Sequence, residues 1–89
     1  MTKAVWKFEF EIINKFEISM PRDSEILAVQ VQNGTPCIWA LVNPDVVQEK
    51  RVFRLAGTGH DIHYDMGVDY KYIGTFQLDI LVFHLFEYL

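Results

Sequence analysis

The sequence predicts an all-β domain, a small antiparallel β-sandwich or barrel of about six or seven strands with little or no helix. Three observations support this prediction. Apolar and polar residues alternate with a period of two over most of the chain, Asn33-Gly34 marks a tight hairpin, and no long segment has helical periodicity. With 89 residues the chain is expected to form one domain, residues 1–89.

Four strands are predicted in the first half of the chain. The first, residues 4–13, alternates large apolar side chains with charged ones and therefore has one core face. A second, short strand covers residues 16–20. Two more strands, residues 27–32 and 37–42, flank Asn33-Gly34, the dipeptide favoured in type I′ turns because both of its residues adopt positive φ.

A two-residue turn fixes the register of this hairpin. It pairs Gln32 with Thr35 and Val31 with Pro36. Because the nitrogen of Pro36 has no hydrogen to donate, this end of the strand is expected to lie at a sheet edge. The same register predicts two apolar faces, one with Val29, Ile38, Leu27 and Ala40 and the other with Ala28, Trp39, Ile26 and Leu41.

The second half contains a strand with two arginines, residues 51–56, and two C-terminal strands, residues 70–78 and 80–88. His84 alternates with apolar neighbours, so we expect a hydrogen-bonded histidine near the core. Residues 57–69 have no clear period and are expected to be irregular.

Composition limits the function. The chain is 51% hydrophobic and 15% aromatic, more than one small core needs, so part of this surface is expected in a homo-oligomer or partner interface. A formal net charge of −4 argues against direct DNA or RNA binding. Cys37 is the single cysteine, which excludes an intrachain disulfide and fits a small packed residue in a reducing compartment. Nothing in the sequence indicates a cofactor.

No secretory signal or membrane span is visible. The longest uncharged run, residues 26–43, is interrupted by the hairpin signal, which a spanning helix would not carry. We therefore expect a soluble protein of the cytoplasm.

Basic residues and histidines are concentrated between positions 50 and 63. Lys50, Arg51 and Arg54 are three of the eight Lys and Arg residues, and His60 and His63 are two of the three histidines. Guanidinium groups bind phosphate or carboxylate through paired hydrogen bonds. This segment is the best candidate ligand site, and the alternative for each arginine is solvated or ion-paired surface.

The two arginines are three positions apart, so on a regular strand their side chains leave opposite faces. Phe53 and Leu55 share the face of Arg51, and Ala56 shares the face of Arg54. One chain therefore cannot bring both arginines to one ligand, although arginines from two chains could converge.

The segment Gly57-Thr58-Gly59 is a candidate anion-binding nest of backbone N–H groups, to which Thr58 and His60 would add donors. The alternative is a tight turn whose glycines supply positive φ. It is not a dinucleotide fingerprint, because Ile62 occupies the place of the third glycine. Two weaker hypotheses are a metal site from His60, Asp61, His63 and Asp65 and a hydrolytic set of Thr58, His60 and Asp61.

Two aromatic residues complete the predicted site. Trp39 lies on the face opposite Ile38 and Ala40, where it could stack on a base or fill a partner's pocket, with core packing as the alternative. Tyr72 lies near the irregular segment and is a candidate for stacking or a hydroxyl contact. The predicted ligand-binding residues are Trp39, Arg51, Arg54, Thr58, Gly59, His60 and Tyr72, with no catalytic or metal-binding residue.

Several motifs extend over nearly the whole chain: Trp6-Lys7-Phe8-Glu9, Met20-Pro21, Ile26-Leu27-Ala28-Val29-Gln30, Trp39-Ala40-Leu41-Val42, Phe53-Arg54, Gly57-Thr58-Gly59-His60, Tyr72-Ile73-Gly74-Thr75-Phe76 and Phe83-His84. Together they resemble a family of short uncharacterised proteins encoded in bacteriophage and prophage genomes. The resemblance implies a small phage accessory protein in the cytoplasm of the bacterial host, where host takeover and counter-defence are common tasks. It implies no activity or site residue.

Two functions follow from these features. The first is a non-enzymatic, oligomeric binder that sequesters a phosphate-bearing, nucleotide-type immune signal. The second is a protein-interaction module that inhibits a host or defence protein, and a small hydrolase is a third and weaker alternative. The binder predicts a pocket lined by Arg51 or Arg54 with Thr58 and His60, whereas the interaction module predicts an exposed apolar patch or a free sheet edge.

Overall fold

The computed structural model describes residues 2–60 and 69–89. Its seven strands are β1 (Ala4–Glu9), β2 (Lys15–Pro21), β3 (Glu25–Gln32), β4 (Thr35–Val42), β5 (Gln48–Gly57), β6 (Tyr70–Leu78) and β7 (Leu81–Tyr88). Within the described ranges no helix is long and apolar enough to cross a membrane.

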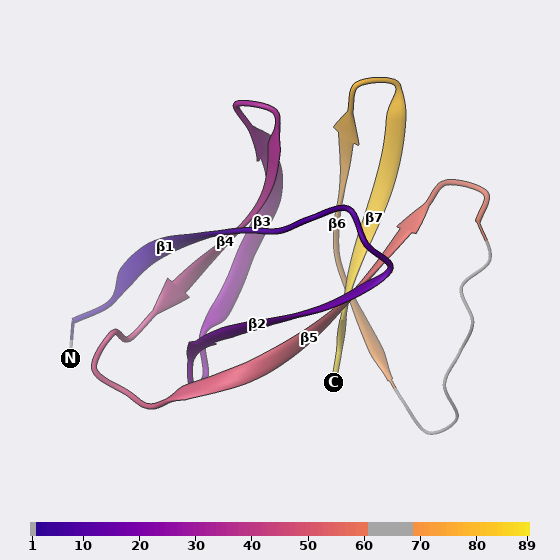
Figure 1. Cartoon of the computed structure of the whole chain (residues 1–89). Coiled ribbons are helices and arrows are strands. Elements are labelled where there is room, and N and C mark those ends of the chain that lie inside the picture. Colours follow the sequence, from indigo (N-terminus) through magenta and orange to yellow (C-terminus); the bar gives the residue numbers. More distant parts are fainter. Residues whose placement is uncertain (1, 61–68) are drawn as a thin grey trace.

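The strands form two antiparallel sheets. In the three-stranded sheet β4 lies between β1 and β3, and the four-stranded sheet has the order β2-β5-β7-β6. Figure 1 shows the long β5 running from below the three-stranded sheet to the β6–β7 hairpin. The prediction of a small all-β sandwich is confirmed.

Side chains from both sheets form one hydrophobic core. Ile38 from β4 and Phe53 and Leu85 from the four-stranded sheet are fully buried in it. Phe10, in the connection between β1 and β2, stacks on Phe16 with their ring centroids 4.7 Å apart. Because successive strand residues point to opposite sides, each sheet has an inner face toward this core and an outer face away from it.

The two sheets approach most closely where β3 packs against β6. A Cβ atom on Gly74 of β6 would lie 2.9 Å from Cγ1 of Val29 in β3. Glycine at this position therefore lets the two strands come together and closes one side of the sandwich.

The hairpin prediction is confirmed in its turn and in most of its register. Asn33 and Gly34 have φ values of 52° and 79°, as a type I′ turn requires. Gln32 pairs with Thr35 and Val31 pairs with Pro36.

The predicted faces near the base of this hairpin are wrong for two residues. A bulge between Ile26 and Ala28 places Ile26, instead of Leu27, opposite Ala40. Ile26 packs against the core, and Leu27 is 46% exposed. One extra residue in a strand reverses which side chains point inward, and strict alternation cannot anticipate it.

The expectation that Pro36 marks a sheet edge is also wrong, because β4 is the central strand of its sheet. The β1–β4 ladder ends at the pair of Glu9 and Cys37, so no residue of β1 pairs with Pro36 itself. Beyond the ladder, the Phe10 amide donates to the Pro36 carbonyl at 3.1 Å. The missing N–H of proline therefore leaves no strand partner unsatisfied.

Candidate functional site

Arg51 lies on the inner face of β5 and is held by a buried ion pair. Its Nε and Nη2 atoms donate to the two carboxylate oxygens of Glu87 in β7, the latter at 2.9 Å. Its Nη1 atom donates to the Ser24 carbonyl at 2.8 Å. The side chains of Arg51 and Glu87 are 18% and 6% exposed. The ion pair therefore joins β5 to β7 and to the turn before β3.

The hydrogen bond to Glu87 raises the pKa of Arg51, which outweighs the opposing effect of burial. All three guanidinium nitrogens donate to groups of the protein. These bonds use three of the five N–H groups of Arg51, so a ligand at the other two would share the guanidinium with Glu87 and the Ser24 carbonyl.

Arg54 lies on the outer face of the same strand, and no described carboxylate forms an ion pair with it. It pairs across the sheet with Lys15 of β2 and Phe86 of β7. Its Nε atom is buried and has no hydrogen-bond acceptor among the described residues. A buried donor without an acceptor costs about 1–3 kcal/mol, so such a group calls for a water or a ligand.

Arg54 belongs to a cation–aromatic row that crosses all four strands on this outer face. The row consists of Lys15 in β2, Arg54 in β5, Phe86 in β7 and Tyr72 in β6. The rings of Tyr72 and Phe86 are 5.5 Å apart, and Tyr72 is 55% exposed. Lys15 and Arg54 have no carboxylate within ion-pair distance in the described chain. The row therefore presents two positive charges beside an accessible ring.

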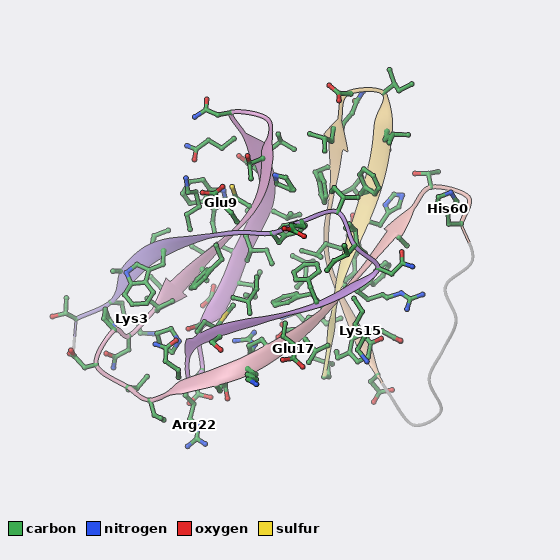
Figure 2. All side chains as sticks on the ribbon, in the orientation of Figure 1. Lys3, Glu9, Lys15, Glu17, Arg22 and His60 are labelled. Carbon is green, nitrogen blue, oxygen red and sulfur yellow. The ribbon has the colours of Figure 1, made fainter. Side chains whose placement is uncertain are left out.

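Aromatic side chains continue from this row toward the end of the sheet. The rings of Tyr70 and Tyr88 meet edge to face at 4.6 Å, and Lys15 Nζ lies 5.0 Å from the centre of the Tyr88 ring. Figure 2 shows Lys15 and Glu17 on the same stretch of β2, with His60 apart from them at the turn after β5. Glu17 lies near Lys50, with Lys50 Nζ at 3.9 Å from its carboxylate.

A hydroxyl–histidine chain lies next to the row on the same face. Thr58 Oγ1 lies 2.7 Å from Nε2 of His84, and Thr75 Oγ1 lies 2.9 Å from Nδ1 of His84. The hydroxyl of Tyr72 is hydrogen-bonded to Thr75 Oγ1. Both imidazole nitrogens are therefore in use, and Tyr72 belongs to both the chain and the row.

The segment after β5 forms a tight turn. The His60 amide donates to the Gly57 carbonyl at 3.1 Å, and Gly59 has a φ of 85°. The Thr58 amide donates to the Val82 carbonyl at 3.1 Å. Two N–H groups of the hypothetical anion nest are thus already bonded. The His60 ring packs over Gly57, where an added Cβ atom would be 2.7 Å from Nδ1.

Trp39 belongs to the three-stranded sheet, whereas the cation–aromatic row belongs to the four-stranded sheet. Trp39 is half-buried on the outer face of the three-stranded sheet, paired with Lys7 of β1 and Ala28 of β3. The structure does not bring Trp39 together with Arg54 or Tyr72. Cys37, on the same face as Trp39, is buried, with its thiol 3.3 Å from the Thr35 carbonyl.

The other predicted site residues line different surface hollows. One hollow of about 440 Å³ has Arg51 in its wall, together with Lys50, Lys71 and Glu87. Another, of about 320 Å³, is lined by Gly57, Thr58, His60 and residues 80–83. Neither hollow contains Arg54 or Tyr72, and neither joins an arginine to Thr58 and His60. The cation–aromatic row lies instead on an open face of the sheet, with Lys15 and Tyr72 exposed.

The metal and hydrolase hypotheses involve Asp61, His63 and Asp65, which lie outside the described residues. In residues 2–60 and 69–89 no three His, Cys, Asp or Glu side chains group together as metal ligands would. The hydrolytic hypothesis paired Thr58 with His60. In the structure the Thr58 hydroxyl is hydrogen-bonded to His84 instead.

Sequence reasoning missed Lys15, Thr75 and His84 as members of the site. Lys15 and Arg54 are 39 positions apart, and their proximity depends on the pairing of β2 with β5. Thr75 is the cross-strand partner of His84, and it shares a face with Tyr72 only because of the bulge between Tyr72 and Gly74. The one sequence feature that pointed to this face was the strand alternation, which placed Arg54 and Arg51 on opposite faces of β5.

Comparison with known proteins gives a family and no function. A family model described as "Domain of unknown function (DUF7352)" matches residues 1–89. No curated protein and no solved structure matches the chain.

Proposed function

The chain belongs to the DUF7352 family, a family of domains of unknown function, and we propose that it is a non-enzymatic binder of a phosphate-bearing, nucleotide-type ligand. The proposed site is the outer face of the four-stranded sheet, where the cation–aromatic row crosses the hydroxyl–histidine chain. The observation that carries the proposal is the buried Nε atom of Arg54, which has no acceptor among the described residues. Once the Arg54 side chain turns to expose this atom, a phosphate oxygen would supply that acceptor and a countercharge together.

The order of groups along the row suits a nucleotide. Lys15 and Arg54 are on neighbouring strands at one end, and Tyr72 is two strands beyond Arg54 at the other. Strands are about 4.8 Å apart, so the cations and the exposed ring are separated by roughly 10 Å. A base stacked on Tyr72 would place its phosphate toward Arg54 and Lys15.

Local charge supports the same ligand class. The protein has a formal net charge of −4, yet no carboxylate of residues 2–60 and 69–89 forms an ion pair with Arg54 or Lys15. Two uncompensated cations side by side repel each other, and a bound anion removes that repulsion. The hydroxyl groups of Thr58 and Tyr72 add neutral hydrogen-bonding positions at the margin.

An open face covers too little of a small ligand for tight binding, because ligand sites generally bury most of the ligand surface. We propose that a second copy of the chain covers the face, so that the binder is a homo-oligomer. The resemblance to phage and prophage proteins supports a role in the infected bacterial cytoplasm, where the protein would sequester a nucleotide-type immune signal and so counter host defence.

Binding is tested by calorimetric titration with AMP, adenosine and inorganic phosphate. We expect AMP to bind more tightly than adenosine or phosphate alone, because only AMP engages both the ring and the cations. Arg54→Gln should abolish AMP binding, while Arg22→Gln, at an exposed arginine near Glu49, should leave it unchanged. Equal AMP binding by wild type and Arg54→Gln would overturn the proposal, and so would no AMP binding by the wild type.

Native mass spectrometry of protein purified from phage-infected cells tests the physiological ligand and the oligomer together. We expect a mass of at least two chains with a retained phosphate-bearing molecule. A bare monomer from infected cells would contradict the sequestering role.

A second candidate function, a protein-interaction module, is favoured by the tip of the β6–β7 hairpin. Ile80, Leu81 and Val82 are 91%, 57% and 36% exposed and border the hollow of about 320 Å³. Exposed apolar side chains beside a hollow are typical of a protein contact. Ile80→Glu should then abolish retention of a host or defence protein in a pull-down without changing AMP binding. Retention unaffected by Ile80→Glu would exclude the tip.

A further inference from the structure

The hydroxyl–histidine chain contains more hydrogen-bonding hydrogens than it needs. Three hydrogen bonds join Thr58 to His84, His84 to Thr75 and Thr75 to Tyr72. Each hydroxyl carries one hydrogen, and a neutral imidazole carries one more. Each bond uses a single hydrogen, so one O–H remains, and the Val82 carbonyl, 3.5 Å from Thr58 Oγ1, can accept it. This count holds for either imidazole tautomer.

Protonation of His84 changes the count. Both imidazole nitrogens then donate, to Thr58 on one side and to Thr75 on the other. The Thr58 hydroxyl then donates to the Val82 carbonyl, 3.5 Å away, and one of the hydroxyls of Thr75 and Tyr72 becomes free to donate outward. The protonated chain therefore offers an outward donor at Thr75 or Tyr72 together with one positive charge.

The described charged groups on the row beside His84 are cations. Arg54 is its diagonal neighbour on β5, and Lys15 lies one strand farther on β2, with its ammonium group over the Tyr88 ring. Tyr72 lies beside His84 on β6. The neighbours of His84 on β7, Val82 and Phe86, are apolar. Glu17 is the described carboxylate on this face of β2, and it lies near Lys50. A bound anion favours the protonated form of a titratable group beside it.

We infer that His84 takes up a proton when the proposed ligand binds, so that the hydroxyl–histidine chain gains a positive charge and an outward donor for the phosphate. Arg54 and His84 are diagonal neighbours across β5 and β7, since Arg54 pairs with Phe86 and Ala56 pairs with His84. Diagonal neighbours on a sheet are about 7–8 Å apart, which long side chains bridge. A phosphate held by Arg54 is therefore within reach of the chain.

This inference rests on the proposed function and makes ligand binding dependent on pH. Histidine is the side chain that titrates near neutral pH, and binding linked to one proton changes with pH by at most tenfold per pH unit. The affinity for a phosphate-bearing ligand should increase as the pH falls, and the ligand should in turn favour the protonated histidine.

The test is calorimetric titration of AMP into wild type, His84→Gln and His60→Gln between pH 5.5 and 8.5. AMP protonation contributes equally to all three proteins, so their differences report on the protein alone. We expect the affinity of wild type and His60→Gln to fall by up to tenfold per pH unit relative to His84→Gln as the pH rises. Glutamine donates and accepts hydrogen bonds but takes up no proton.

A second measurement needs no variant. Titrations of wild type in buffers of different ionisation enthalpy should show proton uptake on AMP binding. AMP binding without uptake, or an unchanged pH profile in His84→Gln, would overturn the inference and leave the proposed function in place. Failure of the wild type to bind AMP would overturn the proposed function and this inference with it.

Discussion

Arg51 and Arg54 are three residues apart on one strand, yet the structure uses them in opposite ways. Arg51 points to the inner face, where every guanidinium nitrogen donates to Glu87 or to the Ser24 carbonyl. Arg54 points to the outer face, where its buried Nε has no acceptor among described residues. The inner arginine completes the fold, and the outer one retains unused hydrogen-bonding capacity.

The same contrast extends over the two faces of the four-stranded sheet. The inner face carries the fully buried Phe53 and Leu85 and the Arg51–Glu87 pair. The outer face carries exposed or half-buried polar and aromatic groups, among them Tyr72 and His84. Substitutions on the inner face should therefore lower stability without changing ligand affinity, whereas those on the outer face should lower ligand affinity without lowering stability.

The largest effect is expected from breaking the inner ion pair. Glu87→Leu leaves the Arg51 charge buried without its partner, which should lower the free energy of unfolding by about 3–5 kcal/mol. Urea denaturation followed by fluorescence measures this change. The double variant Arg51→Met/Glu87→Leu should recover most of the loss, because it removes both charges. A loss below about 1 kcal/mol in Glu87→Leu would show that the pair contributes no more than a surface ion pair.

Tyr72→Ala should give the next largest effect, in affinity instead of stability. Loss of a stacked base costs about 1–3 kcal/mol, so AMP affinity should fall by roughly fivefold to more than a hundredfold. Tyr72→Phe keeps the ring and should retain most of the affinity. Equal losses in Tyr72→Ala and Tyr72→Phe, measured by calorimetry, would assign the effect to the hydroxyl and exclude stacking.

Arg54→Leu should change the free energy of unfolding in the opposite direction from Glu87→Leu. Leucine keeps apolar packing on the sheet and removes the buried donor, so the free energy of unfolding should rise by about 1 kcal/mol. The same variant should lose AMP binding. Such a trade between stability and activity is typical of functional residues. Destabilisation comparable to that of Glu87→Leu would indicate a structural role for Arg54.

Alternation along each strand was sufficient to predict the all-β fold and the opposite directions of Arg51 and Arg54. The Asn33-Gly34 turn also predicted the pairing of Val29 with Ile38. Bulges were not predictable, because an extra residue changes the facing of a strand without a distinctive local sequence, as at Leu27. The grouping of Lys15, Arg54 and Tyr72 depends on which strands are neighbours, and this is decided by packing of the whole chain.

The smallest effect is expected at Trp39, which lies on the outer face of the other sheet. Trp39→Ala should leave AMP affinity within experimental error of the wild type, because no residue of the cation–aromatic row belongs to that sheet. Calorimetry under the conditions used for Tyr72→Ala checks this expectation. A loss as large as that of Tyr72→Ala would mean that the ligand contacts both sheets, as in an oligomer that joins the two outer faces.

The most direct test of an anion site on the outer face is a ¹H–¹⁵N correlation spectrum recorded during AMP titration. We predict that the largest shifts fall on the Arg54 Nε–H, the His84 ring and the backbone around Lys15 and Tyr72. The Arg51 Nε–H should remain where it is in the free protein. Shifts confined to the hairpin tip at residues 80–82 or to the surroundings of Trp39, or no shift at Arg54 Nε–H, would contradict the account.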